Sequence, residues 1–375
     1  MPARSAGFGR LIAVTPESNV HLQRSADRAV EVEALVSRLG GRAGLAGVLG
    51  DLNRTAHRVR VPAPAAAWGF RWDHDDLLSR RWWPQGITTS ADAGDGVAGD
   101  LGGRAILVTS SYAHVVDGVH RGARLSFVDL TDQHDIRYRH VLLVEPFFRD
   151  DGAVDVRPVK VHAGGIVWHG DFLHVAGTAR GFSSFRLSDL VAVPAHHSTR
   201  LRIRGDRVEA FGYRYLLPVR FTYDAHASTG LERMRYSFAS IDRSTRPHEL
   251  VAGEYGRGDM TTRLVRYAFD PDTSLLRADT DGAARPVVLE EGGVPGMQGA
   301  TVVHGTWFVT TSRGRFRLGS VWVGRPGELR ERRHQLPVGP EDITYWPERD
   351  QLWSLSEYPG ARFVFGMPRE RFVGG

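Results

Sequence analysis

The chain has 375 residues, of which 42% are hydrophobic and 24% charged, so it can bury a core and is not intrinsically disordered. It has no cysteine, which excludes disulfides and a cysteine nucleophile, and no apolar run approaches the ~18 residues of a membrane helix. The net charge is +5, but the arginines lie along the whole chain beside acidic residues, so we expect neither a nucleic-acid nor a membrane partner.

Residues 1–57 are predicted to form a helical N-terminal segment. The first residues hold only a four-residue apolar run before Thr15 and Pro16, which is too short for a signal peptide, so we expect a cytoplasmic protein. Between residues 24 and 53, apolar side chains recur at helical spacing until Gly40 and Gly41: Val30, Val32, Leu35, Val36 and Leu39. We expect this apolar face to pack on the rest of the protein.

Residues 58–375 carry short apolar runs that are broken by turn residues about every ten positions, which predicts an all-β fold. Five segments repeat one plan, in which a polar or small residue precedes two or three strands. They begin near Gln85, His162, Tyr213, Gln298 and Glu341. Small sheets of this kind cannot bury their own faces, and radial stacking of them forms a β-propeller. We predict five blades, with six as the alternative if YRHVLLVEP (138–146) or RLVRYAFDP (263–271) begins another.

Three segments carry a resemblance to a known group: WWPQGITTS (82–90), VHAGGIVWHGDFLHVAGTARG (161–181) and PEDITYWPERDQLWSLSEYPG (340–360). They resemble the blade motifs of an uncharacterised group of bacterial, often actinobacterial, β-propeller proteins, many of them exported. The resemblance covers about residues 68–370 and implies the fold but no activity. The chain departs from exported members in its N-terminal segment, which favours an intracellular role in secondary metabolism.

The first strand of each propeller blade lines the central channel, so the polar residues that begin these strands are the candidate site. We predict His162, Glu341 and Asp342 as acid–base catalysts and Gln85 and Gln298 as substrate-binding residues. Neighbouring glycines fit, because backbones crowd together near the axis. The alternative is that these polar groups bind one another and close the channel.

Aromatic residues near strand ends form a second candidate set. We expect Trp83, Tyr112 and Tyr215 to line a substrate pocket. In RWDHDD (71–76), Asp75 or Asp76 could face Glu341 as the second carboxylate of a glycosidase, although a solvated turn is the simpler interpretation.

No cofactor is expected, although the oxygen-rich set could hold calcium or another divalent ion. Redox and nucleotide motifs are missing from the sequence. We therefore favour an enzyme that acts on a small, largely apolar metabolite as a cyclase, lyase or isomerase. A non-catalytic ligand-binding or scaffold propeller and a glycoside-active hydrolase remain the alternatives, so whether the chain is an enzyme stays open.

Overall fold

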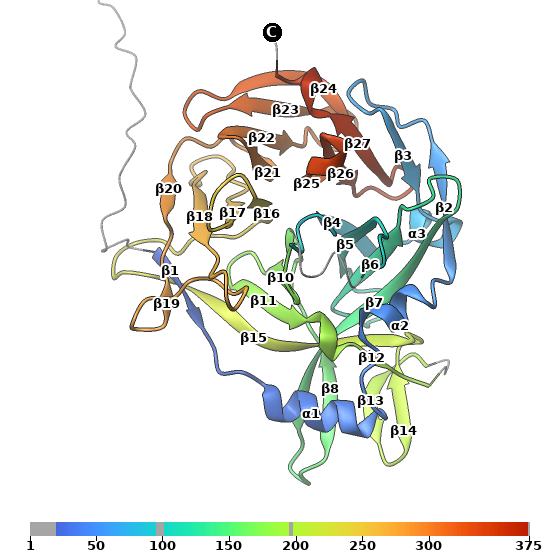
Figure 1. Cartoon of the computed structure of the whole chain (residues 1–375). Coiled ribbons are helices and arrows are strands. Elements are labelled where there is room, and N and C mark those ends of the chain that lie inside the picture. The colour runs from blue at the N-terminus through green and yellow to red at the C-terminus, as the bar shows by residue number, and fades with distance from the viewer. Residues whose placement is uncertain (1–19, 95–100, 195–197, 374–375) are drawn as a thin grey trace, which may run out of the picture.

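The structure is a computed structural model that describes residues 20–94, 101–194 and 198–373 (Figure 1). Strands make up 49% of the chain and helices 9%, which confirms the all-β prediction. The prediction about a signal peptide falls on residues that lie outside this described part. Among the described residues, no helix is long and apolar enough to cross a membrane.

Five groups of four antiparallel strands are arranged around a common centre as in a β-propeller (Figure 1), and further backbone pairing joins three of these groups into one 17-stranded sheet. The first contains β4 (Trp82–Thr89), β5 (Ile106–Ala113), β6 (Ala123–Asp129) and β7 (Ile136–Phe148). The second contains β9 (Ile166–His169), β10 (Phe172–Ala176), β11 (Gly181–Arg186) and β15 (Tyr215–Ala227). The third contains β16 (Phe238–Asp242), β17 (Glu249–Gly253), β18 (Leu264–Ala268) and β20 (Val288–Glu290).

The last two sheets show how the ends of the described chain meet. The fourth contains β21 (Met297–Val303), β22 (Thr306–Thr311), β23 (Leu318–Gly324) and β24 (Arg330–Val338). The fifth contains β25 (Pro340–Trp346), β26 (Gln351–Ser356), β27 (Phe363–Pro368) and β3 (Trp68–Arg71). Its outer strand β3 therefore comes from the N-terminal part and pairs with β27 from the C-terminal part.

The remaining elements lie at the periphery. They are β1 (Val20–Arg24), α1 (Ala29–Arg38), α2 (Gly44–Leu49), β2 (Arg54–Val59), α3 (His74–Leu78), β8 (Val154–Pro158), β12 (Val191–Ala192), β13 (Leu201–Arg204), β14 (Arg207–Ala210) and β19 (Ala283–Ala284). β1 pairs with β15 and β19, and β2 pairs with β3 and β7. Residue 57 falls inside β2, so backbone hydrogen bonds join the predicted N-terminal segment to the sheets.

Helix α1 packs as its sequence pattern predicts. Val32, Leu35 and Val36 are buried in one cluster with side chains of β7 and β8, whereas Val30 is exposed. The burial of the apolar face is confirmed. The strand pairing of β1 and β2 was not predicted, because such short strands take their register from partners far away in the sequence.

The innermost strands β4, β9, β16, β21 and β25 contact one another in sequence around the centre, and β25 contacts β4. Their backbones approach closely at glycines. A Cβ atom on Gly165 would lie 2.0 Å from the nitrogen of Ala239, and one on Gly299 would lie 2.6 Å from the Cα of Asp342. The expected crowding of inner strands around small residues is therefore confirmed.

Gly165→Ala should destabilise the protein because the new methyl group meets the backbone of β16, which cannot move without its sheet. We expect a loss of roughly 1–3 kcal/mol or more in the free energy of unfolding, measured by urea denaturation. Gly177→Ala is the control, since its Cβ would lie an ordinary 3.4 Å from Val161 Cγ1. Equal stability of the two variants would contradict the close strand contact.

One predicted repeat unit is wrong. The segment around Tyr213–Pro218 does not begin a sheet, because it belongs to β15, the outer strand of the sheet that begins with β9. β15 also pairs in parallel with β7 and is buried on both faces, so its apolar sequence resembles that of an inner strand. The two segments considered for a sixth blade are β7 and, for RLVRYAFDP, β18, both outside the innermost positions.

Candidate functional site

Three innermost strands share one irregularity, and it positions the predicted polar residues. Their pairing register shifts between Pro84 and Ile87, between Met297 and Gly299, and between Pro340 and Ile343. A bulge adds an unpaired residue and redirects its side chain. The residues inside the three shifts are Gln85 with Gly86, Gln298, and Glu341 with Asp342.

Four of the side chains at the inner strand ends form one polar chain. The Nε2 of Gln298 donates to Oε1 of Glu341 at 3.2 Å, and the Nε2 of Gln85 donates to Oε2 of Glu357 at 3.2 Å. The carboxyl groups of Glu341 and Glu357 are hydrogen-bonded to each other. The structure therefore brings Gln85, Gln298 and Glu341 close to one another through Glu357, which is not among the predicted site residues.

Glu357 follows β26, and its amide donates to the carbonyl of Gly339 at 3.0 Å, just before β25. This position could have been predicted from the sequence, because antiparallel pairing places the end of β26 beside the start of the innermost strand β25.

The carboxyl groups of Glu341 and Glu357 both have raised pKa values. Burial, the charge of Glu357 and the charge of Asp342 raise the pKa of Glu341 well above its usual range. Burial also raises the pKa of Glu357, and hydrogen bonds from Gln85 and Tyr358 partly offset this. Two carboxyl groups so close together do not ionise independently, because the charge of one raises the pKa of the other. Glu341 is only 3% exposed and Glu357 is half-buried, so Glu357 is the member that a ligand can reach.

Aromatic side chains surround this pair. The ring of Tyr112 lies 4.5 Å from that of His162 and 5.1 Å from that of His114. Trp83 lies 4.8 Å from His114 and 6.0 Å from Tyr358. Trp83 and Tyr112 are thus part of one aromatic wall, and Tyr358, which was not selected as a site residue, belongs to it.

His162 belongs to this wall as well. It lies in the loop before β9, is exposed, and has no hydrogen bond to either carboxyl group among the described residues. Partial desolvation by the surrounding protein and the charge of the nearby His114 lower the pKa of His162, so the neutral imidazole is favoured. The geometry gives His162 a tilted ring contact with Tyr112, and its catalytic role stays a prediction.

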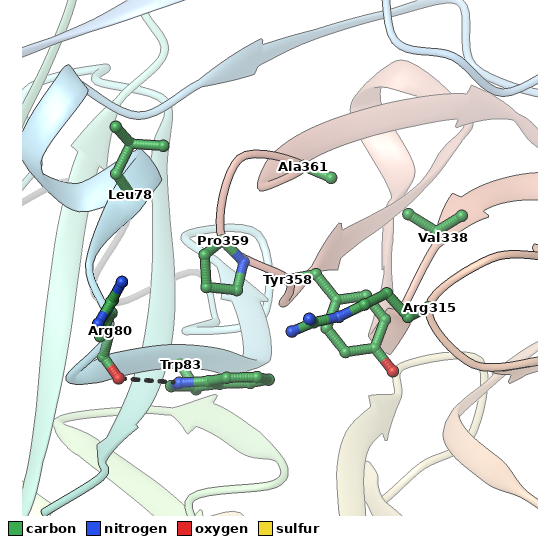
Figure 2. A pocket seen from close by; sticks show the side chains of 8 residues that line it. All are labelled: Leu78, Arg80, Trp83, Arg315, Val338, Tyr358, Pro359 and Ala361. Atoms are coloured by element: carbon green, nitrogen blue, oxygen red, sulfur yellow. Dashed lines mark hydrogen bonds between the residues drawn. The ribbon is translucent and has the colours of Figure 1, made fainter.

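A pocket of about 420 Å³ lies beside the pair. Figure 2 shows its lining: Leu78, Arg80, Trp83, Arg315, Val338, Tyr358, Pro359 and Ala361. Tyr358 connects the two features, because it lines the pocket and directly follows Glu357 in the chain. The size is within the range of small-molecule sites.

Two predicted site residues lie elsewhere. Tyr215 is buried under α2, where its hydroxyl donates to the carbonyl of Gly47 and to Oδ2 of Asp51, each at 3.0 Å. The expectation that Tyr215 lines the pocket is wrong because β15 is an outer strand. Asp342 is fully buried, and its Oδ2 accepts from the amide of Ile87 at 3.2 Å, so it ties β25 to β4. Burial raises the pKa of Asp342 well above its usual range.

RWDHDD is not a solvated turn. Its last three residues begin α3, where Asp73 Oδ1 accepts from the amide of Asp76 and caps the helix. Asp76 is 7% exposed and accepts from Arg124 at 2.7 Å, Tyr138 at 2.7 Å and His140 at 2.8 Å. Its carboxylate is therefore occupied by buried partners and does not face Glu341 as a second catalytic acid. Among the described residues, no group of three or more potential ligands is arranged to hold a metal ion.

Comparisons with known proteins give a weak structural likeness. No family model and no curated protein matches the chain. A gluconolactonase from Xanthomonas campestris is 13% identical with a TM-score of 0.35, covering 85% of this chain and 88% of that chain. The Cps50 (Swd1) β-propeller domain from Myceliophteria thermophila is 10% identical with a TM-score of 0.37, covering 77% and 98%. A GH43_1 enzyme from Xanthomonas citri is 12% identical with a TM-score of 0.33, covering 78% and 88%. Such likenesses decide neither the blade count nor the activity.

Proposed function

We propose that the five sheets are the blades of a closed five-bladed propeller, and that the chain is an enzyme that moves protons at one mouth of its channel. The contact of the two carboxyl groups of Glu341 and Glu357 beside an aromatic pocket carries this proposal. The sequential contacts of the five innermost strands and the pairing of β3 with β27 support the blade count.

The pair can act as acid and base in one site. With one shared proton, the ionised carboxylate accepts a proton from the substrate and the protonated carboxyl returns one at another atom. Glu357 meets the substrate, and Glu341 stores the proton while the Nε2 of Gln298 orients it. This chemistry supports isomerisation, elimination or cyclisation of a small, largely apolar metabolite held against Trp83 and Tyr358.

The other two functions are less well supported by the geometry. A glycosidase needs its carboxylates about 5–10 Å apart to hold a sugar between them, whereas these two are in hydrogen-bond contact. A binding or scaffold propeller would need only the closed polar chain. A binding or scaffold propeller would form no product, which distinguishes it from the proposed enzyme and from a glycosidase.

The test is incubation with a small-molecule extract in D₂O and, separately, in ¹⁸O-labelled water, followed by mass spectrometry. We expect a product that carries no ¹⁸O and that is missing with Glu341→Gln, and an isomerised or cyclised product should also carry solvent deuterium on carbon. Incorporation of ¹⁸O would identify a hydrolase instead. Identical metabolite profiles with both proteins would overturn the proposed enzyme and favour a binding protein.

The shared proton also predicts a pH dependence of stability. The folded pKa of Glu341 is raised, so its neutral form stabilises the fold at low pH and this contribution is lost as pH rises through the folded pKa. Glu341→Gln cannot ionise and keeps the hydrogen bonds. We expect the variant to melt higher than the wild type at about pH 9 and no higher at about pH 5. A difference in melting temperature that does not change with pH would contradict the shared proton.

A further inference from the structure

We propose that the pocket of Figure 2 binds the carboxylate of a small aromatic or apolar acid, with Arg315 as the anchor and Arg80 as a second cation. This inference rests on the proposed function, because it names the substrate class of the same site.

The first observation is two cations without a carboxylate partner. Arg80 and Arg315 are both exposed, and neither guanidinium has a salt bridge within the part of the chain that the structure describes. In the same loop, Arg313 pairs with Glu331. Arg315 instead lies with its Cζ 5.2 Å from the centre of the Tyr358 ring, and Figure 2 shows its guanidinium extending over the pocket. A guanidinium binds a carboxylate through two parallel hydrogen bonds.

The second observation is exposed apolar surface on the same rim. Leu78 lines the pocket and is 47% exposed. Trp83, Pro359 and Tyr358 add further apolar faces. Apolar walls with few placed charges are typical of sites for amphipathic small molecules. The combination favours an acid with a ring or short apolar body over a sugar or an inorganic ion.

The third observation is the path from the pocket to the acid pair. Tyr358 lines the pocket, its ring lies under Arg315, and the next residue back along the chain is Glu357. A ligand whose carboxylate pairs with Arg315 would lay its apolar body along Trp83 and Tyr358 and bring its far end to Glu357.

Phenylacetate and its neutral analogue phenylacetamide are suitable probes, since they differ only in the charged group. Binding is measured by ligand-observed NMR titration with the wild type, Arg315→Leu and Arg317→Leu. Arg317 is the matched control, because it is an exposed arginine of the same loop that does not line the pocket. We expect phenylacetate to bind the wild type and Arg317→Leu equally. Its binding to Arg315→Leu should be roughly tenfold weaker. Phenylacetamide should bind all three proteins poorly.

Equal binding of the acid and the amide, equal loss in both arginine variants, or no binding of phenylacetate to the wild type would overturn the inference. Glu341→Gln separates it from the proposed function, because Glu341 does not line the pocket. We expect this variant to bind phenylacetate like the wild type. If binding depends on Arg315 but the labelling experiment shows no turnover, the carboxylate site is supported and the proposed enzyme activity is rejected.

Discussion

Glu341→Gln is expected to lower turnover of the natural substrate by about a hundredfold or more near neutral pH, which is the usual scale for losing an acid–base group. The substitution keeps the shape of the side chain and can still accept from Gln298 and donate to Glu357. It removes only the proton that the two carboxyl groups share. Steady-state kinetics should show the loss in kcat, with KM little changed, because the buried Glu341 does not meet the substrate.

Asp342→Asn is the matched control for that measurement. Asp342 is the next residue, is also buried and also has a raised pKa, but its carboxylate accepts from the backbone of β4 and not from the polar chain. We expect this variant to change stability more than kcat. If Asp342→Asn lowers kcat as strongly as Glu341→Gln with an unchanged melting temperature, the catalytic acid lies deeper on the axis and the pair is not the active group.

Glu341 and Asp342 show which features of the site can be predicted from the sequence. Gln85, Gln298 and Glu341 could be predicted because each stands beside a small residue or a proline at the start of a strand that begins a repeat. That local pattern marks a bulge near the axis. It does not tell which bulged side chain faces the mouth and which faces a neighbouring strand, so Glu341 and Asp342 could not be separated.

The remaining site residues depend on contacts between distant parts of the chain. Gln85 and Glu357 lie 272 positions apart, and Glu357 ends a strand with no polar repeat to mark it. Tyr215 was misplaced because a strand that pairs on both sides is uniformly apolar, and an inner and an outer strand of that kind look alike. Arg315 stands among many arginines, and only the folded structure shows that it lacks a carboxylate partner.

The buried ion pairs around Asp76 are connected to this site through Arg362. Asp76 contacts Arg124, Arg54 and His140, and the hydroxyl of Tyr138 donates to it. Arg362 then links the cluster to the mouth, since its Nη1 donates to the carbonyl of Asp76 and its Nε donates to the carbonyl of Glu357, each at 2.7 Å. Loss of an ion pair in this cluster should therefore disturb the loop that carries Glu357.

Asp76→Ala should lower the free energy of unfolding by roughly 3–5 kcal/mol, because it leaves the buried Arg124 without its counter-charge. Burial opposes ionisation of Asp76, but the charges of His140, Arg124 and Arg54 hold its pKa well below the usual range. A carboxylate with a depressed folded pKa stabilises the protein above its unfolded pKa and loses this contribution as pH falls. Burial lowers the pKa of His140 to about 4, so its contribution is also lost as pH falls, beginning near the ordinary histidine pKa.

Urea denaturation of Asp76→Ala at several pH values tests this cluster, with Asp75→Ala as the control. Asp75 is the preceding residue of α3 and is exposed, so its removal should change stability by less than about 0.5 kcal/mol. We expect the difference between the two variants to be large at neutral pH and to shrink in acid, since Asp76 no longer contributes once its carboxylate in the folded protein is protonated. If the two variants unfold alike at neutral pH, the ion pairs around Asp76 do not hold α3 and the Glu357 loop in place.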